Sequence, residues 1–108
     1  MEVTFTDMKD INLNNIIDIR ENYVYNLCKI KGSRNIPYEF LIFNPADYLN
    51  KNEKYYILCD NGHKSRLLSE ILNSYGYHTF SIKGGINEYL KNKWFFFNLK
   101  ICCAIIGL

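Results

Sequence analysis

The sequence lacks the features that mark several large classes of protein. Its 13 basic and 11 acidic side chains leave a formal net charge of only +2, and the basic residues are scattered along the chain. This balance argues against nucleic acid as a partner. The N-terminus has neither the basic start nor the apolar stretch of a signal peptide, and no apolar run reaches the roughly 20 residues that a membrane span needs. We therefore expect a cytoplasmic protein with no transmembrane segment.

Cysteine is present, but not in paired motifs. The four cysteines are Cys28, Cys59 and the adjacent Cys102 and Cys103, and no two of them form a CxxC pair. A structural zinc site is therefore not expected, and neither is any other metal or cofactor. Thiols stay reduced in the cytoplasm, so a disulfide framework is not expected either. Cys28 falls in a stretch predicted to be helical and is interpreted as a packing residue.

Length and pattern predict a single α/β domain. The chain has 108 residues, with no internal repeat and no low-complexity linker. We place the domain at residues 1–93 and a separate apolar tail at residues 94–108. Predicted strands alternate with predicted helices, which favours a mainly parallel sheet flanked by helices. Strands are expected at 15–20, 55–58 and 78–82, with Val3 and Phe5 in an edge strand, and helical segments at 21–27, 38–44, 46–49 and 86–91.

The clearest element is the run Tyr55-Tyr56-Ile57-Leu58, which is typical of a central strand buried on both faces. It leads through a short loop into a helix. The predicted apolar face of that helix consists of Leu67, Leu68, Ile71, Leu72 and Tyr75. Gly76 is placed to end the helix in the left-handed conformation.

Cys59 directly follows this strand and is the main candidate for chemistry. Ligands of open α/β sheets gather at the carboxyl ends of strands, and a helix N-terminus offers unpaired N–H groups and partial positive charge. Gly62 permits a tight loop there, and Lys64 adds a full positive charge. Such surroundings favour a thiolate nucleophile. A strand-end cysteine alone is more often an inert buried residue, but the glycine, lysine and serine of this loop favour a reactive one.

At this loop the sequence resembles the rhodanese-like sulfurtransferase family. The family pattern C-x-x-G-x-[RK]-S is matched by Cys59, Gly62, Lys64 and Ser65. Three further segments resemble family motifs and occur in the same order. They are residues 17–21 (IDIRE), 29–37 (KIKGSRNIP) and 82–89 (IKGGINEY). The resemblance covers roughly residues 1–92.

The resemblance implies a parallel five-stranded sheet and a double-displacement reaction. A donor such as thiosulfate or a persulfide, which could be carried by a protein, passes its outer sulfur to Cys59, and a thiol or cyanide then removes it. Cys59 would be the nucleophile and persulfide carrier. The loop residues would bind substrate: Asp60, Asn61, Gly62, His63, Lys64 and Ser65. The supporting residues would be Asp18, Arg20 and Arg66.

Two other functions remain as alternatives. One is a rhodanese fold that serves only as a binding module. The other is a cysteine-dependent phosphatase or arsenate reductase, whose C-x5-R loop is poorly matched because position 65 is serine and Arg66 lies one residue too far along.

The tail is almost wholly apolar, with Lys100 as its one charged side chain. We expect it to pack on the domain's own surface or at a homodimer contact, since such a patch in water promotes association. Attachment at a membrane surface is an alternative. Cys102 and Cys103 are interpreted as packing residues, with attack on a Cys59 persulfide as the alternative role.

Overall fold

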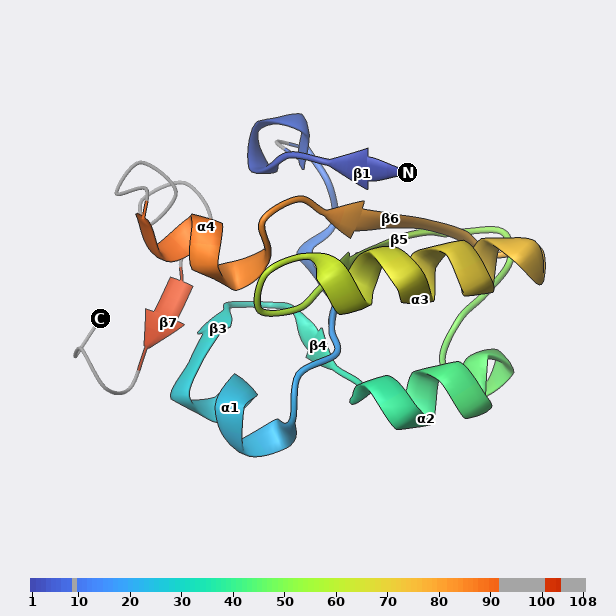
Figure 1. Cartoon of the computed structure of the whole chain (residues 1–108), viewed down its shortest axis with the longest axis horizontal. Coiled ribbons are helices and arrows are strands. Elements are labelled where there is room, and N and C mark those ends of the chain that lie inside the picture. Colours follow the sequence, from blue (N-terminus) through green and yellow to red (C-terminus); the bar gives the residue numbers. More distant parts are fainter. Residues whose placement is uncertain (9, 92–100, 104–108) are drawn as a thin grey trace.

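Five short parallel strands form the central sheet of the molecule (Figure 1). The computed structural model describes residues 1–8, 10–91 and the backbone of residues 101–103. The strand order is β1-β6-β5-β2-β4, and every neighbouring pair is parallel. The strands are β1 (Glu2–Val3), β2 (Ile16–Asp18), β4 (Arg34–Asn35), β5 (Lys54–Leu58) and β6 (His78–Ile82). The predicted α/β fold with a parallel five-stranded sheet is thus confirmed.

Helices connect the strands and cover the sheet (Figure 1). The α-helices are α1 (Asn22–Leu27), α2 (Tyr38–Phe43), α3 (His63–Ser74) and α4 (Gly85–Lys91). Short 3-10 helices occupy Phe5–Met8, Leu13–Asn15 and Pro45–Asp47. None of the helices within the described residues is long and apolar enough to cross a membrane.

The central strand β5 separates two apolar clusters. Tyr55 and Ile57 pack with Leu68 and Leu72 of α3 on one face of the sheet. Leu58 packs on the other face with a cluster that includes residues of the first 3-10 helix and of α4. Alternate side chains of one strand are therefore buried on opposite faces, as the aromatic and branched run predicts. This burial fixes the position of Cys59, the residue that follows β5.

The buried face of α3 differs from the predicted one. Its buried residues are Ser65, Leu68, Ser69 and Leu72, whereas the predicted Leu67 and Tyr75 are 54% and 60% exposed. The serines are buried because β6 supplies hydroxyl partners. The Ser65 Oγ lies 2.6 Å from the Ser81 Oγ, and the Ser69 Oγ lies 2.7 Å from the Thr79 Oγ1. The helix nevertheless ends as predicted, with Gly76 at φ +98°.

Phe5 was expected in the edge strand, and this expectation is wrong. The strand β1 ends at Val3, and Phe5 begins a 3-10 helix. The turn forms because the Thr4 N–H and Oγ1 both donate to the Asp7 Oδ2, at 3.0 and 2.8 Å. These hydrogen bonds hold the pKa of Asp7 below its ordinary value. Phe5 is consequently buried edge-on against the ring of Tyr89.

Two expectations for Cys28, a helical position and a reduced thiol, are also wrong, whereas the residue does pack against an apolar cluster. Cys28 lies in a strand, β3 (Cys28–Ile30), and it is disulfide-bonded. β3 pairs antiparallel with β7 (Ile101–Cys103), in a register that sets Cys28 opposite Cys103. Local sequence pattern did not reveal this strand because its partner is about 70 residues away in the chain. Residues 94–100 and 104–108 of the tail lie outside the described residues, so packing of the tail on the domain or at a dimer contact stays a prediction.

Candidate active site

The Cys59 sulfur lies at the carboxyl end of β5, beneath the first turn of α3. The residue is buried, with 4% of its surface exposed, and it is a free thiol. The Gly62 N–H donates to the sulfur at 3.1 Å, and the Ser65 N–H donates at 3.4 Å. The thiol itself donates to the Ser65 Oγ at 3.3 Å. Two backbone donors at a helix N-terminus therefore converge on one sulfur, an arrangement that stabilises negative charge there.

The loop curls around the sulfur because of residues at two positions. Gly62 adopts φ +95°, a left-handed conformation that other residues resist. Asn61 lies just before it, and its Oδ1 accepts the His63 N–H at 3.0 Å, which closes the turn that begins α3. A side chain at Gly62 would also press on the chain at Gly84, because a Cβ would lie 3.1 Å from the Gly84 nitrogen.

The start of α4 holds the loop from the opposite side. The Ile86 N–H donates to the Cys59 carbonyl at 2.9 Å, and the Asn87 N–H donates to the Asp60 carbonyl at 3.0 Å. Gly85 makes this approach feasible, since it has φ +61° and a Cβ there would meet the carbonyl oxygens of both Cys59 and Asp60. The Gly84-Gly85 segment is therefore a close packing contact that orients the cysteine loop.

Asp18 and Arg20 form a buried ion pair beside the loop. The Arg20 Nη2 donates to the Asp18 Oδ2 at 2.7 Å, and the Nε donates to both carboxylate oxygens at 3.0 and 3.2 Å. The Nη2 also donates to the Cys28 carbonyl at 2.6 Å, which ties the end of β2 to β3. Both side chains are nearly fully buried, so their contacts orient the chain at Ile19 and Arg20.

Cys59 opens into a small cavity of about 200 Å³. Ile19 and Arg20 form part of its wall, together with Asp60, Lys64 and Tyr38. The Lys64 ammonium lies 5.8 Å from the centre of the Tyr38 ring, within reach of a cation–π contact.

Carboxylates outnumber cations around this small cavity. Its lining contains three carboxylates, from Glu21, Glu39 and Asp60. The lining also contains two cations, but Arg20 is paired with Asp18, so among the described residues Lys64 is the one cation of the lining that has no carboxylate partner. Two of these carboxylates, Glu21 and Asp60, act on a tyrosine of the same lining. The Glu21 carboxylate raises the pKa of Tyr23, both by its charge and by a hydrogen bond, and Asp60 adds to the effect.

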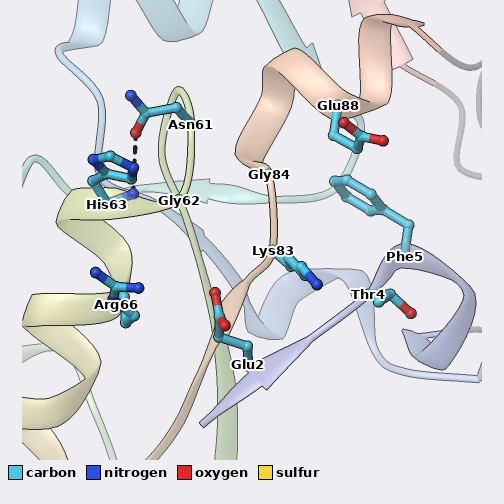
Figure 2. Close-up of a pocket in the computed structure, with 10 residues that line it drawn as sticks. All are labelled: Glu2, Thr4, Phe5, Asn61, Gly62, His63, Arg66, Lys83, Gly84 and Glu88. Carbon is cyan, nitrogen blue, oxygen red and sulfur yellow. Dashed lines mark hydrogen bonds between the residues drawn. The ribbon is translucent and has the colours of Figure 1, made fainter.

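A larger cavity of about 630 Å³ lies behind the loop and does not include Cys59 among its lining residues (Figure 2). The predicted site residues therefore divide between two cavities. Asp60 and Lys64 line the small cavity with Cys59. The larger cavity is lined instead by Asn61, Gly62, His63 and Arg66. We assign the chemistry to the small cavity because the sulfur opens into it.

Sequence reasoning missed several residues that shape the site. Ser81 of β6 is one, since its hydroxyl is the 2.6 Å partner of the Ser65 Oγ and so links the sulfur to the sheet. Tyr38 and Glu39 are others, because the segment that carries them reaches the loop only through the fold. In the part of the chain that the structure describes, no three His, Cys, Asp or Glu side chains gather to hold a metal ion.

The fold and the site together define a parallel α/β domain with a cysteine held by loop amides at the end of its central strand. A profile of the family described as Rhodanese-like domain matches residues 4–92. The chain belongs to this rhodanese-like domain family. A comparison with curated proteins found no match.

Solved structures agree with this assignment. The SSP1007 protein of Staphylococcus saprophyticus shares 33% identity over 82% of this chain and 93% of its own, with a TM-score of 0.73. A rhodanese-like domain protein of Staphylococcus aureus shares 27% identity over 80% of this chain and 88% of its own, with a TM-score of 0.70. A rhodanese-related protein of Thermoplasma volcanium has the same fold at 24% identity, covering 83% of this chain and 90% of its own, with a TM-score of 0.72.

Proposed function

We propose that the chain is a sulfurtransferase that carries sulfane sulfur as a persulfide on Cys59. The observation that carries this proposal is the pair of N–H donors, from Gly62 and Ser65, on a buried free sulfur. The same donors would stabilise a persulfide anion in this position. They already point at the sulfur, so they need neither to shed water nor to rearrange when the reaction takes place.

The reaction has two displacement steps. In the first, the Cys59 thiolate attacks the outer sulfur of the donor, the donor's S–S bond breaks, and sulfite or a thiolate leaves with the bonding electrons. The Cys59 proton is lost to solvent beforehand. In the second, an acceptor thiolate or cyanide attacks the outer sulfur of the persulfide, and the S–S bond to Cys59 breaks. The thiolate is thereby restored, and no external oxidant or reductant is consumed.

The charges around the small cavity affect which sulfur donor reacts faster. Lys64 would attract an anionic donor, but Glu21, Glu39 and Asp60 would repel a dianion such as thiosulfate. A persulfide has a lower charge at its reacting end, so we expect a small or protein-bound persulfide to react faster than thiosulfate.

The test is turnover with both donors, measured as thiocyanate formed from cyanide. Cys59→Ser should abolish turnover while leaving the circular dichroism spectrum unchanged, because serine is nearly isosteric with cysteine. Turnover retained by this variant would refute the proposal.

The same protein should be assayed with an aryl phosphate. The cavity of about 200 Å³ around Cys59 is lined by a lysine and three carboxylates, and its one arginine is already paired with Asp18. It therefore offers no free guanidinium to grip a phosphate oxyanion. Hydrolysis that depends on Cys59 would instead favour the phosphatase class.

A further inference from the structure

The larger cavity behind the cysteine loop has the size of a small-molecule site. Its volume is about 630 Å³, within the usual range for pockets that hold small ligands. Three parts of the chain form it: β1 with the start of the first 3-10 helix, the cysteine loop with the start of α3, and the connection from β6 together with α4 (Figure 2). It is separate from the small cavity into which Cys59 opens.

Charged side chains of both signs line this larger cavity without pairing. Arg66 and Lys83 are the cations, and Glu2 and Glu88 are the carboxylates. Within residues 1–8 and 10–91 the side chains of these four make no ion pair and no hydrogen bond. Their donors and acceptors therefore remain available to a ligand placed between them.

The balance of these charges indicates what kind of ligand fits. Two cations and two carboxylates cancel, so the lining gives no net attraction to a polyanion or to a polycation. A ligand with one carboxylate and one ammonium group meets a partner for each, and a guanidinium can grip a carboxylate through two parallel hydrogen bonds. Phe5 adds an apolar surface, and Figure 2 shows its ring lying between Thr4 and Glu88.

We propose that this larger cavity is a binding site for a small zwitterion of the amino-acid or short-peptide class. The carboxylate end would lie against Lys83 and the ammonium end against Glu88, which Figure 2 shows apart from each other on the cavity lining. The site is close to the chemistry, since Gly62 lines the cavity while its N–H donates to the Cys59 sulfur. The proposal does not depend on sulfur transfer, because it concerns the opposite side of the loop.

The test uses amide NMR of the full chain titrated with triglycine, a zwitterion without a thiol. Saturable shifts are expected at the amides of Gly62, His63 and Gly84. N-acetyl-triglycine lacks the ammonium group and triglycine amide lacks the carboxylate. Each should bind about tenfold more weakly, because one charge-assisted contact of about 1.4 kcal/mol is lost.

Variants assign each end of the ligand. Lys83→Gln should weaken triglycine about tenfold and reduce the difference between triglycine and its amide. Glu88→Gln should also weaken triglycine about tenfold and should reduce the difference between triglycine and N-acetyl-triglycine. Lys54→Gln is the matched control, because Lys54 is exposed at the far end of β5 and should leave binding unchanged.

Each contrary result overturns the proposal. No saturable shift, equal binding of the capped peptides, or shifts centred on Lys64 and Tyr38 would each show that the larger cavity does not select a zwitterion. Sulfur transfer measured on the same samples reports separately on the proposed function.

Discussion

Replacing Gly85 with alanine should damage both the stability of the domain and the position of the cysteine loop. The alanine Cβ would meet the carbonyl oxygens of Cys59 and Asp60, and the residue would be held at φ +61°. Relief of the contact requires the start of α4 to move away. That movement breaks the hydrogen bonds from the Ile86 and Asn87 N–H groups to the same two carbonyls.

The size of the effect can be worked out from these contacts. A left-handed conformation costs a non-glycine residue roughly 1–2 kcal/mol. Loss of the two backbone hydrogen bonds adds roughly 1 kcal/mol each. The free energy of unfolding should therefore fall by about 3–4 kcal/mol.

Gly76 provides a matched control for this variant. It too has a positive φ, +98°, but a Cβ there would meet only the side chain of Lys51, at 3.6 Å and beyond. Gly76→Ala should therefore lower the free energy of unfolding only by the cost of the left-handed conformation, roughly 1–2 kcal/mol. The difference between the two variants isolates the contact with the cysteine loop.

The measurements are urea denaturation of both variants and the rate at which iodoacetamide alkylates Cys59, followed by mass mapping of the peptide that contains it. Gly85→Ala should change the alkylation rate, because the amides of the loop move relative to the sulfur, and Gly76→Ala should not. If the two variants lose equal stability and alkylate at the wild-type rate, the packing of α4 does not position the loop.

Three further predictions concern the charged groups around the site. Lys64→Ala should lower the rate with thiosulfate by about tenfold or more, because one charge-assisted contact of about 1.5–3 kcal/mol is lost, whereas Lys64→Arg should retain the rate. Equal rates for the wild type and the alanine variant would show that the backbone donors suffice. Arg20→Leu should lower the free energy of unfolding by about 3–5 kcal/mol, because it leaves the buried Asp18 carboxylate without its partner; a loss below about 1 kcal/mol in urea would contradict this. The pKa of Tyr23 should lie above the ordinary tyrosine value of about 10. As the pH rises, the unfolded chain therefore loses this proton before the folded chain does, and the contribution of Tyr23 to the free energy of unfolding declines through the alkaline range. Glu21→Gln should lower the pKa of Tyr23 in an NMR titration, and an unchanged value would mean that the two side chains are not in contact.

Local patterns in the sequence were enough to predict the centre of the fold. The run from Tyr55 to Leu58 lies within β5, with side chains buried on alternate faces, and Cys59 follows it directly. The sequence also predicted a loop that favours a reactive cysteine, because Gly62 and the start of the helix lie within a few residues of Cys59. These features depend on neighbours in the chain, and so the sequence reveals them.

Features that depend on distant partners were not predictable in the same way. The buried serines of α3 become favourable only because Ser81 and Thr79 of β6 offer hydroxyl groups. The pairing of β3 with β7 joins segments far apart in the chain. The cysteine loop also places Asn61 and His63 at one cavity and Lys64 at another. The spacing of these residues in the sequence does not predict this division.

The most direct test of the central claim is the intact mass of the full chain after incubation with thiosulfate or a small persulfide and removal of the excess donor. The account predicts a gain of one sulfur atom, located at Cys59, removed by cyanide and absent from Cys59→Ser. No gain with either donor would contradict sulfur transfer and favour a binding module. A stable gain at another cysteine would contradict the assignment of Cys59 as the carrier.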